Sequence, residues 1–332
     1  MKKGKIFLWL VVTAIIVHLS LVSDYSIRNT SGAEDKYPSR SIEIFCGFAP
    51  GGVTDTLTRL VARKLEQNLK VTVVPGNKPG GGEVIAGSAL ANSPPDGYTL
   101  AILGDASLIT SHLLGRATYS KNDLRVIGEF VFISNVLAVS AESPWKTIQD
   151  FIEHARKNPG LTFSHPGVGS SPSLRVEYFN KVAKLNMKGV PFKGDPEGIA
   201  AVLGKHVAIG VFSGLAAKKQ EEGGKMRILF CFDPPGLSPN PNIPNIPSYF
   251  GKEVPDIDPV SNYLVAAGKT PEGVVKVLEN TLEKITKDPE FVDNMKKMSI
   301  GIRFTDSKSV AQLLERKTSQ IKPILLETGL IK

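Results

Sequence analysis

Short apolar runs alternate with helix-compatible segments along most of this 332-residue chain, and the alternation limits the folds open to it. Runs of strand length and composition lie at 42–48, 71–74, 99–103, 131–139, 161–164, 189–192, 207–212 and 262–267. The helix-compatible segments include Ile148–Lys157 and Leu174–Leu185. Strands and helices in alternation predict an α/β fold of mostly parallel sheets flanked by helices, and the length suits roughly two domains.

The region Asp233–Pro259 interrupts this pattern with eight prolines. Because proline lacks a backbone N–H group and blocks a regular helix, we expect an extended surface connection here. After the strand-like run at Asn262–Ala267, three helical segments are expected to complete the chain.

The N-terminus has the pattern of a secretory signal peptide. Lys2, Lys3 and Lys5 precede an apolar run at 6–22, and small residues follow at positions typical of a cleavage site. We expect residues 1–33 to be a signal peptide; an uncleaved membrane anchor is the alternative. Removal of these residues takes away four cationic side chains and one acidic one, and lowers the formal net charge from +8 to +5.

Glycine-rich turns recur after the apolar runs. They read FAPGGVTD from Phe48, NKPGGG from Asn77, GVGSSPS from Gly167 and VPFKG from Val190. Such turns leave backbone N–H groups unpaired where a helix begins, which favours a bound anion. None carries the Lys-Ser/Thr pair of a phosphate-binding P-loop. The turns therefore predict anion binding by backbone amides, in a crevice between two α/β lobes.

The sequence offers little for catalysis. The histidines outside the leader are scattered, and there is no His-Glu-x-x-His, metal-spaced cysteine pair or Gly-x-Ser-x-Gly motif. We expect no catalytic residue, cofactor or metal, and hence no enzyme. The Lys and Arg residues are dispersed without interleaved aromatic residues, so nucleic-acid binding is not expected.

Two cysteines, Cys46 and Cys231, lie in apolar runs. An exported protein can pair its cysteines. Two buried free thiols are favoured here, because nothing in the sequence brings the sulfur atoms within bonding distance. The sequence leaves a disulfide between them open.

Taken in order, the motifs resemble those of the tripartite tricarboxylate transporter substrate-binding proteins, also called Bug receptors. The similarity runs from about Tyr37 to the C-terminus. Its motifs are YPSRSIEIFCGFAPGGVTDTLTR, NKPGGG, PPDGYTL, GVGSSPSL, VPFKG, LGKHVAIGVFSGLAA and IPNIPSYFGKE. Each motif alone is weak, but together in the family's order they are specific.

The resemblance implies a two-lobed periplasmic binding protein of type II, with a Venus-flytrap closure. We expect lobe 1 to span 34–137 and 230–332, and lobe 2 to span 138–229. Such a receptor is a periplasmic monomer that captures a small mono-, di- or tricarboxylate. It delivers this ligand to the integral membrane permease subunits of a tripartite tricarboxylate-type transporter.

The resemblance also implies the residues that contact the ligand, largely through backbone amides and waters. Phe48 would form a wall of the site, and Asp55 would organise the first turn or accept a hydrogen bond from the ligand. In lobe 1 the full set is Phe48, Ala49, Gly51, Gly52, Thr54, Asp55, Asn77, Gly80, Gly81, Gly104, Ala106 and Ser107. In lobe 2 it is Ser164, Gly167, Gly169, Ser170, Ser171, Phe192, Lys193 and Ser213.

Four positions depart from the family's pattern. Gly47 replaces a usual Pro, Val53 a usual Gly, and Ser173 a frequent His. Ser213 stands where many members have an Asp that holds a ligand's amine. Without this carboxylate, a simple carboxylate ligand is favoured over an amino acid.

Two alternatives to transport stay open. The same fold can sense a ligand for a membrane-bound signalling partner. An exported enzyme in the same crevice would need a nucleophile–base pair or a metal set, which the sequence does not provide.

Overall fold

The computed structural model describes residues 37–233, 238, 242–245, 249, 258–298, 300–327 and 329–332. Arg40–Lys332 form one compact unit that contains two sheets. The predicted signal peptide lies outside the described residues, as does most of the proline-rich region. No helix in the described ranges has both the length and the apolar character needed to span a membrane.

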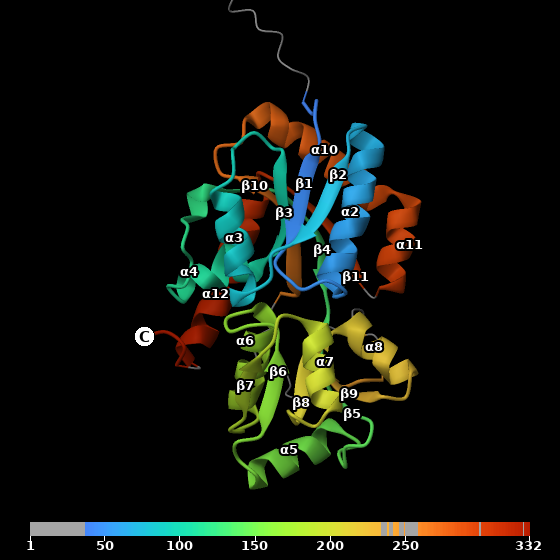
Figure 1. Cartoon of the computed structure of the whole chain (residues 1–332). Coiled ribbons are helices and arrows are strands. Elements are labelled where there is room, and N and C mark those ends of the chain that lie inside the picture. Colours follow the sequence, from blue (N-terminus) through green and yellow to red (C-terminus); the bar gives the residue numbers. More distant parts are fainter. Residues whose placement is uncertain are drawn as a thin grey trace, which may run out of the picture. The chain divides into compact units, whose positions relative to one another are not determined.

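The first sheet has six strands in the order β11-β4-β10-β3-β1-β2 (Figure 1). Their bounds are β1 Ile42–Cys46, β2 Val73–Asn77, β3 Thr99–Gly104, β4 Leu124–Ile133, β10 Val260–Ala267 and β11 Ile300–Asp306. Strands β1, β2 and β3 pair in parallel, whereas β10 is antiparallel to both of its neighbours, β3 and β4.

The helices of this lobe 1 are α2 Val53–Leu69, α3 Val84–Ala91, α4 Ser111–Leu113, α10 Glu272–Lys287, α11 Pro289–Lys297 and α12 Val310–Glu327. Short helical turns form η1 Gly81–Glu83, η2 Ala106–Thr110 and η3 Lys121–Asp123. A buried cluster joins the sheet residues Phe45, Leu103 and Tyr263 to Leu90 of α3 and Leu325 of α12.

The second sheet has five strands in the order β7-β6-β8-β5-β9. Their bounds are β5 Asn135–Ser140, β6 Thr162–His165, β7 Lys188–Pro191, β8 Ile209–Ser213 and β9 Met226–Cys231. The helices of this lobe 2 are α5 Ile148–Lys157, α6 Ser171–Val182, α7 Asp195–Leu203 and α8 Gly214–Glu222.

Alternate residues of β5 build the two cores of lobe 2. Leu137 and Val139 pack with the helices α5 and α6, whereas Val136 and Ala138 pack with α7 and α8. Successive strand side chains point to opposite faces, so the continuous apolar run of β5 serves a sheet covered on both sides.

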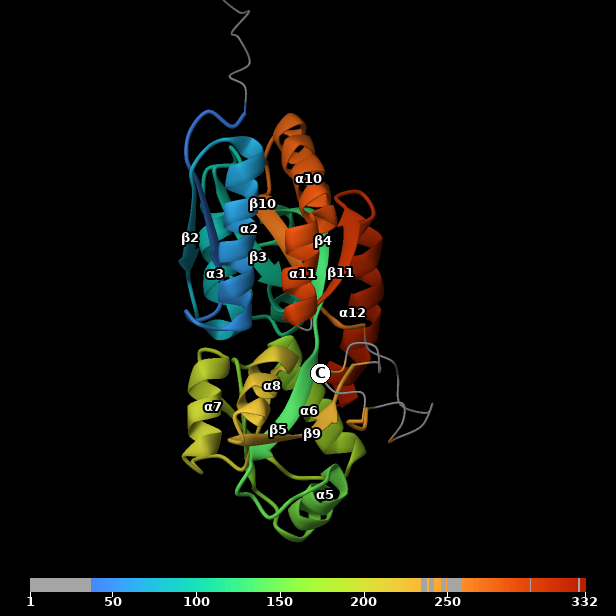
Figure 2. The same ribbon diagram turned by 90° about the vertical axis from the view of Figure 1, so that its right-hand side faces the viewer.

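The predicted α/β fold with two sheets is confirmed, but the sheets are mixed. Three of the five pairings in the first sheet and two of the four in the second are antiparallel. The single strand predicted at 131–139 is wrong, because Ser134 separates β4 of the first sheet from β5 of the second (Figure 2). The lobe boundaries expected at 137/138 and 229/230 fall inside β5 and β9, and both strands pair entirely within the second sheet.

Candidate functional site

A cavity of about 70 Å³ lies between the two sheets and takes its walls from both. One buried water needs roughly 10–15 Å³ of such space, so the cavity has room for several waters or a small ligand. Its lining residues are Phe48, Ala49, Gly52, Val53, Thr54, Glu83, Gly104, Asp105, Ala106, Ile133, Asn135, Pro166, Ser170, Ser171, Pro172, Gly194, Asp195, Val211, Phe212, Ser213, Val260 and Asn262.

Five α-helices begin at this cavity. Helix α2 starts beside Gly52, α3 beside Glu83, α6 beside Ser170, α7 beside Gly194 and α8 beside Ser213, and all five residues line the cavity. The N–H groups in the first turn of a helix have no partner within the helix, and the helix dipole is positive there. Their convergence makes the cavity suitable for an anion.

A polar network holds the first turn in place from outside the cavity. Asp55 accepts hydrogen bonds from the Gly51 amide (2.9 Å) and from Asn77 Nδ2 (3.0 Å), which also donates to the Phe48 carbonyl. Burial alone would raise the pKa of Asp55, but the hydrogen bonds from Arg59, Gly51 and Asn77 outweigh it and lower this pKa. Both oxygens of Asp55 therefore accept hydrogen bonds from within the first turn and its surroundings.

The lobes approach each other at two places next to residues of the cavity wall. The Ala49 amide donates to the Lys193 carbonyl at 3.4 Å. At a second place the chain around Gly82 meets the segment from Gly167 to Ser170 so closely that side chains would not fit. These two contacts join lobe 1 to lobe 2 through backbone atoms.

A buried ion pair lies where the chain passes between the sheets. Asp233, just after β9, accepts a hydrogen bond from Arg175 Nη1 of α6 at 2.7 Å, and both side chains are buried. The other oxygen of Asp233 accepts a hydrogen bond of 2.7 Å from the backbone N–H of Asn135, the first residue of β5. The two crossings between the lobes are therefore tied together at one carboxylate.

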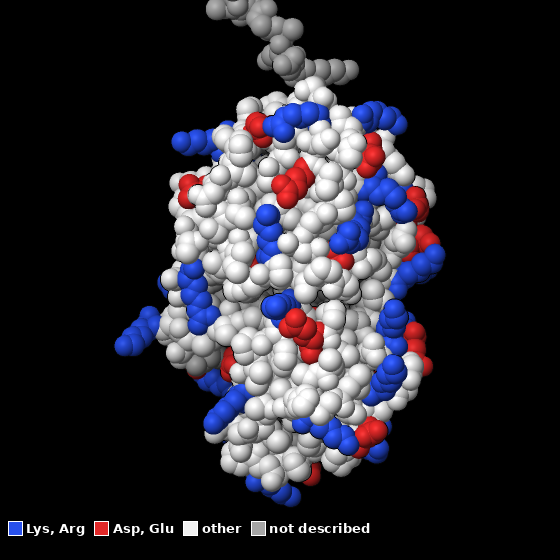
Figure 3. Space-filling view, viewed as in Figure 1, with Lys and Arg blue, Asp and Glu red and all other residues white. Residues whose placement is uncertain are grey.

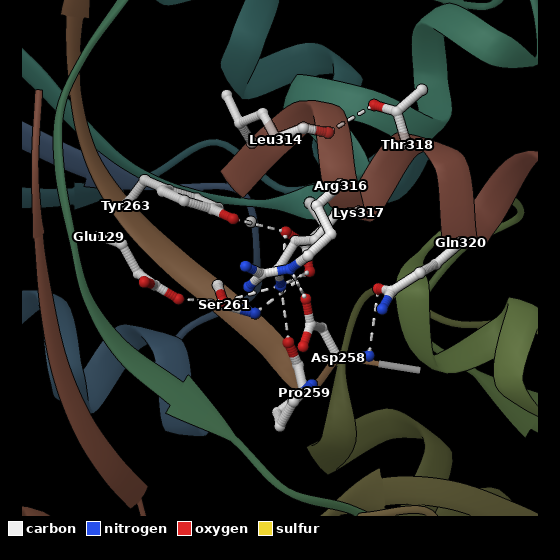
Figure 4. A network of polar contacts seen from close by, with 12 residues as sticks. Glu129, Asp258, Pro259, Ser261, Tyr263, Leu314, Arg316, Lys317, Thr318 and Gln320 are labelled. Atoms are coloured by element: carbon white, nitrogen blue, oxygen red, sulfur yellow. Dashed lines mark hydrogen bonds and ion pairs between the residues drawn. The ribbon is translucent and has the colours of Figure 1, made fainter. Parts of the chain in front are cut away.

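A second buried ion pair joins Lys317 to Asp105, and Figure 4 shows Lys317 close to Ser261 and Pro259. Lys317 Nζ of α12 lies 3.0 Å from Asp105 Oδ2 and also donates to the Ser261 hydroxyl and the Pro259 carbonyl. Tyr263 donates its hydroxyl to Asp105 Oδ1 at 2.8 Å. Asp105 lines the cavity, but its charge is compensated by this network.

Two further acidic residues line the cavity and have no cationic partner in the described part of the chain. Glu83 accepts hydrogen bonds from the Gly104 amide, and Asp195 accepts from the Ser213 hydroxyl at 2.5 Å. Burial raises the pKa of both; that of Glu83 rises to about 8. None of the described residues that line the cavity is Lys, Arg or His.

Several buried polar atoms of the cavity wall have no hydrogen-bond partner among the residues that the structure describes. They are Asn135 Oδ1, Asn262 Oδ1 and the Ser171 hydroxyl. A buried polar atom without a hydrogen bond is costly, and in a cavity wall it marks a place for a water or a ligand.

The structure distributes the predicted site residues among three groups. Those that line the cavity are Phe48, Ala49, Gly52, Thr54, Gly104, Ala106, Ser170, Ser171 and Ser213. A neighbouring cavity of about 540 Å³ is lined by Gly80, Gly81, Gly167, Phe192 and Lys193, together with Arg116 and Glu197. The remaining residues, Gly51, Asp55, Asn77, Ser107, Ser164 and Gly169, line neither.

Members of this last group have other contacts. Ser107 donates to the Glu83 carbonyl, and the space beside Gly169 is filled by Leu114. Ser164 is buried in β6, with its hydroxyl against Gly210 of β8. These residues support the turns without facing the cavity.

Sequence reasoning missed five cavity residues with polar side chains, namely Glu83, Asp105, Asn135, Asp195 and Asn262. Asp105 directly follows β3, and Glu83 and Asp195 lie at helix starts. A polar residue immediately after a buried strand, or at the start of a helix, was the available signal.

Cys46 and Cys231 are buried free thiols, one in each sheet. Burial raises the pKa of both, and that of Cys231 rises to about 11. Neither thiol lines the cavity. Within the described residues, no group of three or more His, Cys, Asp and Glu side chains could hold a metal ion.

Two α/β lobes that meet around a cavity, with the chain passing between them more than once, define a solute-binding protein fold. The family model described as "Tripartite tricarboxylate transporter family receptor" matches residues 57–330. This chain therefore belongs to the tripartite tricarboxylate transporter receptor family.

Known proteins agree with this assignment. The "UPF0065 protein in gbd 5'region" of Cupriavidus necator is 29% identical over 299 residues, which cover 90% of each chain. The structure "R. palustris Rpa4515 with adipate" has a TM-score of 0.82 at 23% identity, and covers 88% of this chain and 98% of its own. For "MatC (Rpa3494) from Rhodopseudomonas palustris with bound malate" the TM-score is 0.78 at 20% identity, with 87% and 100% covered.

Proposed function

We propose that this chain is an exported, periplasmic solute-binding receptor that captures a small organic carboxylate between its lobes and is not an enzyme. The observation that carries the proposal is the convergence of helix N-termini from both lobes, among them those of α2, α6, α7 and α8, on one cavity. Such termini favour an anion through N–H groups and helix dipoles, and require no cationic side chain. The similar structures of Rpa4515 and MatC are described with dicarboxylates, adipate and bound malate respectively.

The receptor would work by lobe closure. A ligand bound by the α2 terminus in lobe 1 would recruit the termini of α6, α7 and α8 in lobe 2. The backbone contacts of Ala49 with Lys193 and of Gly82 with Gly167 would then form beside it. The chain would bend near Ser134, where β4 passes into β5, and the Arg175–Asp233 pair would hold the two crossings together.

Delivery to the permease subunits of a tripartite tricarboxylate-type transporter follows from the family. The closed receptor, as a monomer, would present both lobes to these membrane subunits. On the face in Figure 3, basic and acidic side chains are interspersed, which supports contacts with a protein partner rather than a nucleic acid.

The test is a thermal-shift screen followed by calorimetry with succinate, malate, adipate, citrate and benzoate. An acid present at about 100-fold above its dissociation constant should stabilise the fold by roughly 2.7 kcal/mol. Gly52→Leu should abolish this effect, because Gly52 lines the cavity and its φ of −79° accepts a side chain.

Gly273→Leu is the matched control. Gly273 lies in α10, outside the cavity lining, and a Cβ atom added there would have no heavy atom within 4 Å, so binding should be retained. A folded protein that responds to none of the five acids would refute carboxylate capture.

A further inference from the structure

Glu83 has an unusual backbone conformation for its residue type. Four consecutive residues, Gly80 to Glu83, have positive φ angles of 129°, 61°, 62° and 76°. The first three are glycines, which adopt such angles readily, but Glu83 has a Cβ atom that makes this conformation unfavourable. A strained residue beside a ligand cavity suggests that the side chain itself is needed there.

Two glycines make room for the Glu83 side chain. A Cβ on Gly47 would lie 2.8 Å from Glu83 Cγ, and one on Gly104 would lie 3.1 Å from Glu83 Oε2. The Gly104 amide lies 3.1 Å and 3.0 Å from the two carboxyl oxygens. The carboxyl group is thus enclosed by backbone and supported by one amide, and Glu83 is one of the residues that line the cavity.

The charged groups around Glu83 do not favour a carboxylate there. Asp105 at the end of β3 is the nearest acidic group, and Lys317 of α12 compensates it. Cys46 of β1 and Tyr119 also face Glu83 from lobe 1, and Asp195 lies in the cavity wall contributed by lobe 2. Lys317 is the one cation among these groups, and it is paired with Asp105 and not with Glu83.

We infer that Glu83 is a neutral carboxylic acid that donates a hydrogen bond to the carboxylate of the bound ligand. This inference rests on the proposed carboxylate receptor and names the group that selects the acid. One Glu83 oxygen would accept from Gly104, and the protonated oxygen would donate to the ligand. The proton stays on the protein, as in other sites where a buried carboxylic acid acts as a donor at neutral pH.

Two further observations support this role. Burial raises the pKa of Glu83 to about 8, with Asp105 adding to the shift against the hydrogen bonds of Gly104 and Ser107. The wall of the same cavity also contains three buried polar atoms without a hydrogen-bond partner in the described part of the chain, namely Asn135 Oδ1, Asn262 Oδ1 and the Ser171 hydroxyl.

The inference predicts proton-linked binding. Below pH 8 the donor is present, whereas at higher pH the ligand can bind only if Glu83 takes up a proton. Affinity should then fall about tenfold for each pH unit. Between pH 6.5 and 9.5, the dissociation constant of the tightest acid of the five should rise about 30-fold.

Glu83→Gln tests whether Glu83 donates a hydrogen bond to the ligand or accepts one from it. Gln keeps the shape and supplies N–H donors that do not titrate, so its affinity at pH 6.5 should stay within a few-fold of wild type and lose its pH dependence. If instead the wild-type affinity rises with pH, or Glu83→Gln abolishes binding at both pH values, Glu83 accepts a hydrogen bond from the ligand and the inference is overturned.

A ligand-free measurement tests the protonation state. In protein labelled with ¹³C at the glutamate carboxyl, the signal absent from Glu83→Gln should titrate near pH 8; titration between pH 4 and 5 would overturn the inference. Binding of acids without pH dependence would defeat this inference alone, whereas the absence of any acid binding would defeat the proposed function.

Glu83→Gly is a second variant, which shows whether a loss of binding comes from the missing carboxyl group or from misfolding. It removes the carboxyl group and also relieves the left-handed backbone, so the variant should fold and bind the acid more weakly. Lys70→Gly is the matched control, because Lys70 has a φ of 62° at the end of α2 and lies outside the cavity. Equal binding by Glu83→Gly and wild type would overturn the inference.

Discussion

Gly167 of lobe 2 lies against Gly82 of lobe 1, so that a Cβ on Gly167 would stand 2.8 Å from the Gly82 amide nitrogen. Both residues have positive φ angles, 118° and 62°. Two glycines therefore permit a contact between the lobes that involves backbone atoms on both sides. The contact lies beside the Ser170 turn, which lines the cavity.

Gly167→Ala should weaken this contact. The added methyl group collides with a backbone that cannot rotate away, so we expect a dissociation constant for the preferred acid at least about tenfold higher, a loss of roughly 1.4 kcal/mol. Calorimetry measures the affinity, and urea denaturation measures the free energy of unfolding.

Gly160→Ala is the control for backbone strain. Gly160 has a φ of 93° and no heavy atom within 4 Å of its Cβ position, so the substitution costs conformational energy without a collision. It should lower the free energy of unfolding by roughly 1–3 kcal/mol and leave the affinity unchanged. If both variants lose affinity equally, the contact with Gly82 has no special role.

Gly47→Ala should destabilise the fold through Glu83. The new Cβ would lie 2.8 Å from Glu83 Cγ, and overpacking of this kind costs roughly 1–3 kcal/mol. The double variant Gly47→Ala/Glu83→Gly removes the two side-chain contacts, at 2.8 and 2.9 Å, but leaves the Cα atom of residue 83 at 3.0 Å, so it should recover part of the loss, as measured by urea denaturation. Additive effects of the two substitutions would show that they do not interact. Gly52→Ala should cost less, because its closest neighbour would be at 3.5 Å.

The stability of the ligand-free protein should depend on the protonation of Glu83. Its pKa is about 8 in the folded state, against an ordinary value of 4.5. Between these two values the unfolded chain has released the proton and the folded protein has kept it, so rising pH favours unfolding. The contribution of Glu83 protonation to the free energy of unfolding is fully present below about pH 4.5. It decreases by about 1.4 kcal/mol per pH unit above that value and is lost above pH 8.

Urea denaturation from pH 5 to 9, compared between wild type and Glu83→Gln, measures this contribution. The difference in unfolding free energy should change across the window and level off above pH 8. A constant difference would mean that Glu83 is ionised in the folded protein.

Lys317→Met should be strongly destabilising. The side chain is buried, and its removal leaves Asp105 as an uncompensated charge in the wall of the cavity. Breaking one partner of a buried pair costs roughly 3–5 kcal/mol. The double variant Lys317→Met/Asp105→Asn should recover part of this loss, and denaturation of the wild type and both variants measures it.

Lys297→Met is the matched control. Its partner, Asp293, and Lys297 itself are largely exposed, and such pairs contribute little. If Lys317→Met were no more harmful than Lys297→Met, the buried pair would not support the cavity wall.

The sequence predicted best those helices that combine a periodic pattern of apolar residues with capping residues at their start. Helix α5 has the predicted bounds, because Thr147 and Asp150 form a capping box before an amphipathic segment. Helix α6 begins three residues earlier than predicted, since Ser170 caps it and Pro172 lies in its first turn. Strand β11 was missed: six of its seven residues are only partly buried, and its sequence lacks a continuous apolar run.

The sequence predicted which turns form the site, but not which of their residues line the cavity. Glycine motifs located the turns around Gly52 and Ser170, and the family resemblance added Ser213; all three residues line the cavity. The motifs could not show which residues of a turn face the opposite lobe, because that depends on how closely the lobes approach. Glu83 was missed for the same reason: in sequence it reads as the first residue of a helix after a glycine turn.

The place of β10 in the first sheet has a consequence for biosynthesis. This strand separates β3 from β4, yet it follows them in the chain only after all of lobe 2 has been made. When residues 40–133 emerge from the ribosome they cannot complete their sheet, because β10 has not yet been made. The second sheet, in contrast, has all its strands by residue 231. Pairings between distant segments form slowly. Lobe 2 should accordingly fold first, and lobe 1 should stay open to chaperones until residue 267 arrives.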